Sequence, residues 1–395
     1  GEVRKATMEK KLPRPARTAK PKKAARPAKA KAAKAAKPAR PPTPAQTSAL
    51  DLLRRLSETV SVSGDEGAVR KIIREAVTGL ADEVKVDTIG NLFAIKHGPP
   101  RAPRVLLAAH MDEIGFMIVG IDSDGLLKFE AVGSVDDRVL PGKPVWVGEN
   151  NTPGVIGMKP IHLTKGNELE TVVKIDSLRI DIGATNRDGA GRWVKVGDRA
   201  TFAGSFTELG PTVRGKAFDD RAGCATLIEI LRGRSFPVEL ICAFTVQEEV
   251  GTRGAKVAAF AADADAAIII DCTPANDLPP ASEEDENFKY NTRLGHGPAI
   301  YTHDGSTLHD KRLIRHLVNT AEAKGIPYQR RQPGGGGTDA SAIQKSRAGV
   351  PTVSVSVPGR YIHSPASIIS TSDFHHTAKL IRAALENWDA KVLKR

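Results

Sequence analysis

The chain has 395 residues, 40% of them hydrophobic and 26% charged, which is enough for two domains with cores of ordinary size. Its net charge of +12 comes from one segment: residues 1–48 hold fifteen Lys or Arg against two Glu, a net of +13, so the rest carries about −1. No apolar run reaches membrane-spanning length, and three cysteines without regular spacing argue against disulfides and for a reducing compartment, the cytoplasm.

The first 45 residues are rich in Ala, Pro and Lys and contain hardly any large apolar side chain. Such a segment cannot bury enough surface to offset its chain entropy, so we predict a disordered basic tail over residues 1–45. It lacks the apolar stretch of a secretory signal. Three alternatives stay open for it: a transit peptide, weak binding to polyanions such as nucleic acid, and a solvated extension without function, with Met8 as the true start.

Helical and strand patterns follow the tail. Apolar residues at helical spacing from Ser48 predict a first helix, and Ser63 with Glu66 three residues later predicts the cap of a second. An alternating pattern over 84–96 predicts a hairpin. The next apolar run predicts a buried strand that ends at His110.

The pattern changes between about Gly115 and Phe206, where short apolar runs alternate with Gly, Pro and Asp. This pattern is typical of a small all-β unit such as a barrel. Because it separates His110 from Asp219, which we expect to meet in space, we interpret it as an insertion. The predicted domains are a catalytic α/β domain in two parts, residues 46–116 and 205–395, and an inserted β-barrel oligomerisation domain at 117–204.

Strands and helices alternate after the insertion, which predicts a mixed-sheet α/β/α fold for the catalytic domain. A helix begins just after Asp219-Asp220, and later helices are predicted over 308–324 and 373–393. An acidic stretch at 282–286 has no assigned role.

Three apolar runs end on side chains that bind metals: His110, the pair Glu248-Glu249, and Asp271. Open α/β sheets bind ligands outside the carboxyl ends of their strands. Asp219 at a helix start and His363 after a strand and a turn complete the set. Two His and three carboxylates suit a pair of divalent ions bound by nitrogen and oxygen rather than sulfur.

Each of these residues has a structural alternative when taken alone. Asp219 and Asp220 could both be helix caps, the Glu pair could be an exposed acidic turn, and His363 could be structural. Only the set favours a metal site. Adjacent glutamates project in different directions, so one can bind a metal while the other acts as general base.

Two further features lie near these residues in the sequence. Asp112 falls on the same side of the strand end as His110, where it can orient the histidine or the substrate, or merely cap the strand. The glycine run at 334–337 lacks the Lys-Ser/Thr ending of a phosphate-binding loop. We expect it instead to bring backbone close to the metal site.

Several motifs together resemble the TET-type dinuclear metallo-aminopeptidases, the glutamyl or deblocking aminopeptidase family also described as endoglucanases. The matching segments occur in the family's order over roughly residues 46–390: His110-Met-Asp-Glu-Ile-Gly-Phe-Met, Ala217-Phe-Asp-Asp-Arg-Ala-Gly-Cys, Gln247-Glu-Glu-Val-Gly-Thr-Arg-Gly-Ala, Gly335-Gly-Gly-Thr-Asp-Ala and Arg360-Tyr-Ile-His-Ser-Pro.

The resemblance implies two divalent ions per subunit, zinc or cobalt, with manganese as a further candidate. It also implies dodecameric tetrahedra assembled through the inserted domain, with active sites facing an internal chamber. The roles it assigns are Asp219 as the bridging ligand, His110 and Asp271 at one ion, Glu249 and His363 at the other, Glu248 as general base, and Asp112 tuning His110.

The predicted activity is removal of the N-terminal residue of peptides, with a bridging water activated by the ions and deprotonated by Glu248. A related dinuclear deacylase or carboxypeptidase-type amidohydrolase is the main alternative. A nucleic-acid-associated protein acting through the basic tail and a metal-independent glycosidase are alternatives of other classes. The preferred N-terminal residue is not predicted.

Overall fold

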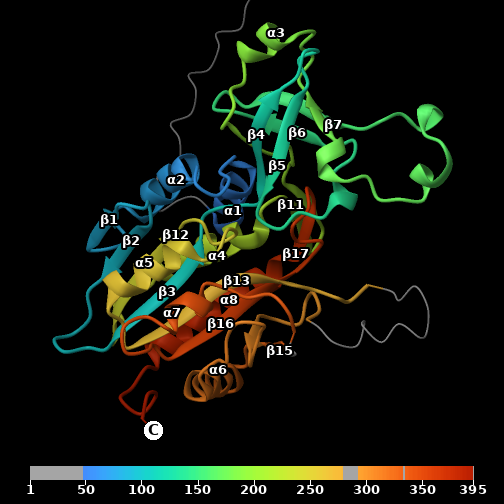
Figure 1. Cartoon of the computed structure of the whole chain (residues 1–395). Helices are drawn as coiled ribbons and strands as arrows, with labels where there is room; N and C mark the ends of the chain where they lie inside the picture. The colour runs from blue at the N-terminus through green and yellow to red at the C-terminus, as the bar shows by residue number, and fades with distance from the viewer. Residues whose placement is uncertain (1–47, 279–291, 332–333, 395) are drawn as a thin grey trace, which may run out of the picture. The chain divides into compact units, whose positions relative to one another are not determined.

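The computed structural model describes residues 48–278, 292–331 and 334–394. The predicted tail at 1–45 and the acidic stretch at 282–286 lie outside the described residues. Within them, an 11-stranded mixed sheet and a closed six-stranded barrel confirm the predicted α/β fold with an all-β insertion (Figure 1). No helix in this part of the chain is long and apolar enough to cross a membrane.

The large sheet has the strand order β1-β2-β12-β3-β13-β16-β17-β11-β10, with β14 and β15 attached beside β16. Its strands are β1 (Glu83–Val86), β2 (Leu92–Lys96), β3 (Arg104–His110), β10 (Thr207–Leu209), β11 (Thr212–Gly215), β12 (Glu239–Thr245), β13 (Ala266–Pro274), β14 (Ala299–Tyr301), β15 (Gln329–Arg331), β16 (Thr352–Arg360) and β17 (Ser367–Ser370).

Helices cover both faces of the sheet because the central strands are apolar on both sides. Alternate residues of β3 pack into two different cores, Val105 and Leu107 into one, Leu106 and Ala108 into the other. The first core contains α1 (Ala49–Glu58), α2 (Gly67–Val77), α4 (Phe218–Leu231), α6 (Lys311–Lys324) and α8 (Thr371–Glu386), and the second contains α5 (Arg253–Ala262) and α7 (Ala340–Ile343).

The barrel lies between β3 and β10 in the chain. Its strands are β4 (Gly115–Ile121), β5 (Leu127–Val132), β6 (Pro144–Val147), β7 (Thr152–Gly157), β8 (Arg179–Asp181) and β9 (Arg199–Phe202). Between them lie the short helices η1 (Asp137–Val139), η2 (Ile161–Leu163), η3 (Gly166–Leu169), η4 (Ile175–Ser177) and α3 (Arg187–Gly191). Phe116 fills the interior with its ring edge-on to Phe129 and Phe202, at centroid distances of 5.1 and 5.3 Å.

Two local predictions were wrong. Ser63 does not cap a helix: α2 begins at Gly67, and the Ser63 hydroxyl instead donates to Asp112. The final helix was predicted to reach residue 393, but α8 ends at Glu386. Trp388 and Val392 still pack into the core from the turn that follows, so their apolar character extended the helical pattern beyond the helix.

Candidate metal centre

Two candidate residues, His110 and Asp271, lie in neighbouring parallel strands, and Glu248 and Glu249 lie in the turn that follows a third strand, β12. Strand β3 pairs with β12 on one side, where Thr245 is opposite His110, and with β13 on the other, where Ile269 is opposite Ala108. Asp271, two residues after Ile269, therefore lies level with His110. The predicted meeting of these strand ends is confirmed, although β13 continues to Pro274 and Asp271 lies within it.

Asp219 lies between two histidines. Its Oδ1 is 3.1 Å from Nε2 of His110, and its Oδ2 is 3.1 Å from Nε2 of His363. The His363 ring is oriented by a 2.9 Å hydrogen bond from Nδ1 to the carbonyl of Ser134, a residue of the insertion. One carboxylate with an oxygen directed at each histidine is the arrangement that a ligand shared by two ions needs.

Asp220 is joined to Asp219 by a cis peptide bond and makes different contacts. It accepts hydrogen bonds from the backbone N–H groups of His110, at 3.2 Å, and Gly223, at 2.9 Å. One of its oxygens also lies within 4.8 Å of ligand atoms of His110 and Asp271. Because both of its oxygens already accept backbone hydrogen bonds, the geometry favours Asp219 as the bridging residue.

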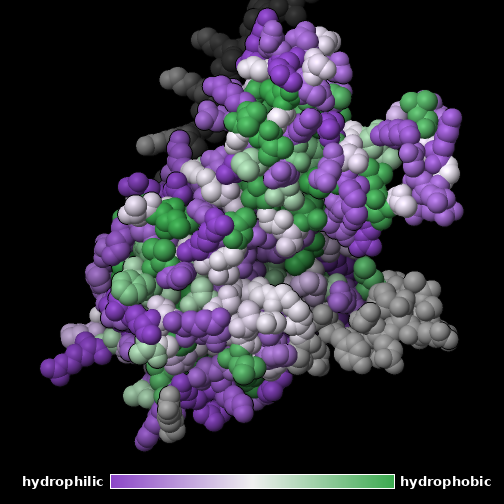
Figure 2. Space-filling view, in the orientation of Figure 1, coloured by the Kyte–Doolittle hydropathy of each residue, from purple (hydrophilic) through white to green (hydrophobic). Residues whose placement is uncertain are grey.

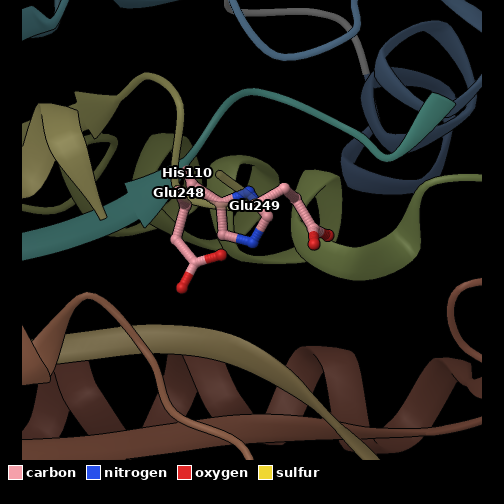
Figure 3. Close-up of side chains that lie close together, drawn as sticks. All are labelled: His110, Glu248 and Glu249. Carbon is pink, nitrogen blue, oxygen red and sulfur yellow. The ribbon is translucent and has the colours of Figure 1, made fainter. Parts of the chain in front are cut away.

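The remaining candidates complete the cluster. Ligand atoms of Asp219, Glu249 and His363 lie within 4.8 Å of one another, as do those of His110, Glu248 and Glu249. Figure 3 shows the two glutamate carboxylates turned in different directions beside the His110 ring. The structure thus brings together all five predicted metal ligands and the predicted base.

The electrostatics of the cluster indicate a site for cations. Burial raises the pKa of Glu249 to about 7, with the Asp219 charge adding to the shift. Burial and the neighbouring carboxylates also raise the pKa of Glu248 and of Asp271 well above their ordinary values. Burial opposes ionisation of Asp219 too, but hydrogen bonds from both histidines outweigh it and lower its pKa. Carboxylates that repel one another in a buried site fit divalent ions.

Asp112 supports the site through the backbone. Its fully buried carboxylate accepts hydrogen bonds from the N–H groups of Glu248, at 3.0 Å, and Glu249, at 3.1 Å, and from the Ser63 hydroxyl at 2.6 Å. Nδ1 of His110 lies 3.0 Å from the Asp112 carbonyl oxygen and 3.5 Å from its carboxylate. Asp112 therefore fixes both the turn that carries the glutamates and the His110 ring.

A cavity of about 910 Å³ opens over the cluster. It is lined by the candidate ligands, by Tyr301 and Arg331 from the edge of the sheet, and by the glycines at 335–337. The glycine loop lines the cavity over the cluster, and Gly336 accepts a 2.9 Å hydrogen bond from the N–H of Gly305 there.

Sequence reasoning did not assign a role to Asp339, which is buried behind the cluster. Its Oδ2 accepts a 2.5 Å hydrogen bond from Thr245, and burial raises its pKa to about 6. The Gly-Gly-Gly-Thr-Asp segment that contains Asp339 was the sequence signal that could have identified it.

A second ionic cluster was also missed. Glu113 is 2.7 Å from Lys216 and 3.5 Å from Arg221, and all three side chains are buried. Its oxygens also accept hydrogen bonds from Ser61 and Thr201, which joins the barrel strand β9 to the sheet. Glu113 follows Asp112 and Arg221 follows Asp220 in the sequence, and Lys216 lies three residues before Asp219, but nothing in the pattern identified the three as one cluster.

Comparisons with known proteins agree with this geometry. Residues 90–380 match the M42 glutamyl aminopeptidase family. A putative aminopeptidase of Acetivibrio thermocellus is 38% identical over 85% of this chain and 98% of its own length. The TET aminopeptidase of Thaumarchaeota archaeon SCGC AB-539-E09 superposes with a TM-score of 0.83 at 35% identity, over 87% of this chain and 97% of that one.

The Pyrococcus horikoshii TET1 peptidase, which can assemble into a tetrahedron or a large octahedral shell, superposes with a TM-score of 0.77 at 36% identity, over 86% of this chain and 100% of that one. The match to the family model covers more than half of the chain, and the relatives are matched over almost their whole length. The chain therefore belongs to the M42 glutamyl aminopeptidase family of metal-dependent peptide hydrolases.

Proposed function

We propose that the protein removes the N-terminal residue of peptides at a pair of divalent ions, zinc or cobalt, with Glu248 as general base. The observation that carries the proposal is the position of Asp219, whose two oxygens face His110 and His363 at 3.1 Å each. His110 and Asp271 would hold one ion, and Glu249 and His363 the other. Bound ions supply Lewis acidity that polarises the scissile carbonyl and lowers the pKa of water.

The side chains of this chain supply the proton transfers and the positioning. Glu248 accepts a proton from the attacking water and donates it to the departing amine. Its backbone is fixed by the buried Asp112 carboxylate, so its side chain stays beside the cluster. The free amino terminus of a peptide would lie beside the ions or one of these carboxylates, which restricts cleavage to the first residue.

The test is hydrolysis of aminoacyl amides after chelation, with zinc, cobalt or manganese added back. We expect chelation to abolish activity and one of the ions to restore it. An N-acetylated copy of the best substrate, which lacks the amino-terminal charge, should not be cleaved. Cleavage of the acetylated peptide at an equal rate would support the deacylase alternative, and chelator-resistant activity would contradict the metal centre.

We also propose that residues 117–204 form the assembly domain of a homo-dodecamer in the cytoplasm. Figure 2 shows hydrophobic surface on the inserted domain, whose most exposed large apolar side chains lie in the segments between its strands. Those more than half exposed are Ile161, Leu163, Leu169, Trp193 and Val196. The three buried free cysteines fit a reducing compartment. Light scattering of wild type and of Ile161→Asp/Trp193→Asp tests assembly, and an unchanged oligomer would contradict the assigned surface.

A further inference from the structure

A second cavity continues from the one over the metal centre. It lies between α5 and α7, which are side by side on one face of the sheet (Figure 1), and has a volume of about 610 Å³. We call it the α5–α7 groove (residues 252–260 and 341–347). Thr252 and Ser341 line both cavities, and the Thr252 N–H donates a 2.9 Å hydrogen bond to the carbonyl of Glu248, the proposed base. The groove therefore begins beside the catalytic centre.

The α5–α7 groove offers apolar side chains to solvent. Val257 and Phe260 of α5 line it, with 41% and 62% of their surface exposed, together with Ala342 of α7. The Arg347 guanidinium holds Phe260 in place: it stacks over the ring, 4.3 Å from the centroid, and its Nε donates to the Phe260 carbonyl at 3.0 Å. An exposed aromatic ring with a fixed position is suited to contact an apolar side chain of a partner.

The charged residues that line the α5–α7 groove are all cations. They are Lys256, Lys345 and Arg347, and none of the described acidic residues lines the groove with them. Arg347 forms an ion pair with Asp263 at 3.0 Å, whereas neither lysine has an ion-pair partner in the described part of the chain. Because charges of opposite sign attract across an interface, the groove suits a partner that carries acidic as well as apolar side chains.

The length of the α5–α7 groove fits a peptide that starts at the metal centre. Phe260 follows Thr252 by eight residues along α5, a rise of about 12 Å at the pitch of a helix. An extended peptide advances about 3.3 Å per residue, so about four of its residues cover this distance. A substrate with its first residue at the ions would therefore place roughly its third to sixth residues along α5.

We propose that the α5–α7 groove binds the trailing segment of the peptide substrate and favours acidic and apolar side chains at about the fourth to sixth residues. The inference rests on the proposed function, because the first residue of the substrate must lie at the metal centre. Aminoacyl p-nitroanilides end before the groove, so their hydrolysis reports on the metal centre alone.

The direct test compares three hexapeptide amides with the same first three residues, the first being the residue whose p-nitroanilide is cleaved fastest. Positions 4 to 6 are Glu-Phe-Glu, Gln-Phe-Gln or Lys-Phe-Lys, and the initial rate of release of the first residue gives kcat/KM. At low salt we expect kcat/KM for the Glu peptide to exceed that for the Lys peptide roughly ten-fold, with the Gln peptide between them. Added salt should reduce the ratio, because it screens exposed charges.

Charge reversal then assigns the preference to the α5–α7 groove. The double variant Lys256→Glu/Lys345→Glu should cleave the Lys peptide faster than the Glu peptide. Partial unfolding cannot invert this order, because both rates come from the same preparation. The matched control is Lys71→Glu, which reverses an exposed lysine of α2 on the other face of the sheet and should keep the wild-type order.

The contribution of the apolar side chains is tested by Phe260→Ser. This variant should lose the preference of the wild type for Glu-Phe-Glu over Glu-Ala-Glu at positions 4 to 6. If its oligomeric state changes in light scattering while this preference stays, the groove is a contact between subunits and the inference is wrong.

Failure of this inference can be distinguished from failure of the proposed function. Hydrolysis of neither the p-nitroanilides nor the peptides would contradict the proposed function. Equal rates on the Glu and Lys peptides, by an enzyme that cleaves p-nitroanilides, would contradict the present inference alone. An inversion in Lys71→Glu as large as that in the double variant would show that the net charge of the protein, not the groove, sets the preference.

Discussion

Two buried ionic clusters lie close together in this molecule and differ in their balance of charge. Around Glu113, one carboxylate serves two cations, Lys216 and Arg221, and backbone groups satisfy the remaining donors. Around Asp219, carboxylates outnumber the two histidines, and several have raised pKa values.

This difference in charge balance distinguishes a cluster that stabilises the fold from a site that binds a ligand. Buried charges that satisfy one another hold the barrel strand β9 against the start of α4. Buried carboxylates that repel one another cost free energy unless cations join them. The excess of carboxylates thus predicts that divalent ions bind at the second cluster.

The largest expected effect is on catalysis at Glu248. Glu248→Gln should lower kcat by about 10²- to 10⁴-fold while both ions stay bound, because the amide retains the shape of the side chain but cannot accept the proton. Metal analysis and initial rates on the same sample check this. Glu249→Gln is the control and should lose metal. Equal metal loss in the two variants would reverse the roles of the adjacent glutamates.

Removing the shared carboxylate of the balanced cluster should instead affect folding. Glu113→Gln leaves two buried cations without a partner and should lower the free energy of unfolding by about 3–5 kcal/mol. Glu208→Gln, which removes an exposed ion pair with Arg54, should change it by less than about 1 kcal/mol. Urea denaturation of both variants checks this, and an effect of Glu113→Gln as small as that of Glu208→Gln would contradict the structural role of the Glu113 cluster.

The next prediction concerns whether the adjacent Asp219 and Asp220 have different roles in metal binding. Asp219→Asn should reduce the occupancy of both ions, because its oxygens face both histidines. Asp220→Asn should be milder, since its carboxylate accepts backbone hydrogen bonds. Metal stoichiometry of the purified variants decides the matter. Greater loss in Asp220→Asn would make Asp220 the bridging ligand.

The smallest effect expected is on the pH dependence of stability. In the metal-free protein the pKa of Glu249 is about 7 and that of His363 about 9, both above the ordinary values of 4.5 and 6.5. Proton binding to these two side chains therefore stabilises the folded state. This stabilisation is fully present when the pH is below the ordinary pKa values, and it is lost as the pH rises through about 7 for Glu249 and about 9 for His363.

The free energy of unfolding of the metal-free protein should therefore fall by on the order of a few kcal/mol between about pH 5 and about pH 9. The melting temperature should fall over the same range. Bound ions displace these protons, so the metal-loaded protein should show a smaller fall. Thermal melts of both forms across this range check the sign. A melting temperature that rises with pH in the metal-free form would contradict it.

Much of the candidate site could be predicted because its residues end apolar runs. His110 and the Glu248-Glu249 pair follow buried strands, and parallel pairing places such ends at one edge of a sheet. His363 was harder, since it lies in a loop with a φ of 57°, and only the complete set of candidates identified it.

The supporting contacts could not be predicted because they join distant segments. The Asp112 carboxylate holds the backbone of Glu248 and Glu249, which lie 136 and 137 residues away in the chain. Ser63 had the local signature of a helix cap, yet the buried Asp112 carboxylate is its partner. The burial of Arg331 was missed because a short strand before a glycine run carries no sign of it.

The hydrogen bond from His363 to Ser134 bears on whether the barrel can be removed. By engaging Nδ1, the Ser134 carbonyl keeps a proton on that nitrogen, so that Nε2, which lies 3.1 Å from Asp219, is the nitrogen that would bind an ion. The insertion thus selects the tautomer of a proposed ligand in the other part of the chain. A trimmed enzyme without residues 117–204 would lose this control as well as any assembly surface. A barrel taken from a relative would therefore need a carbonyl at the same point to orient His363.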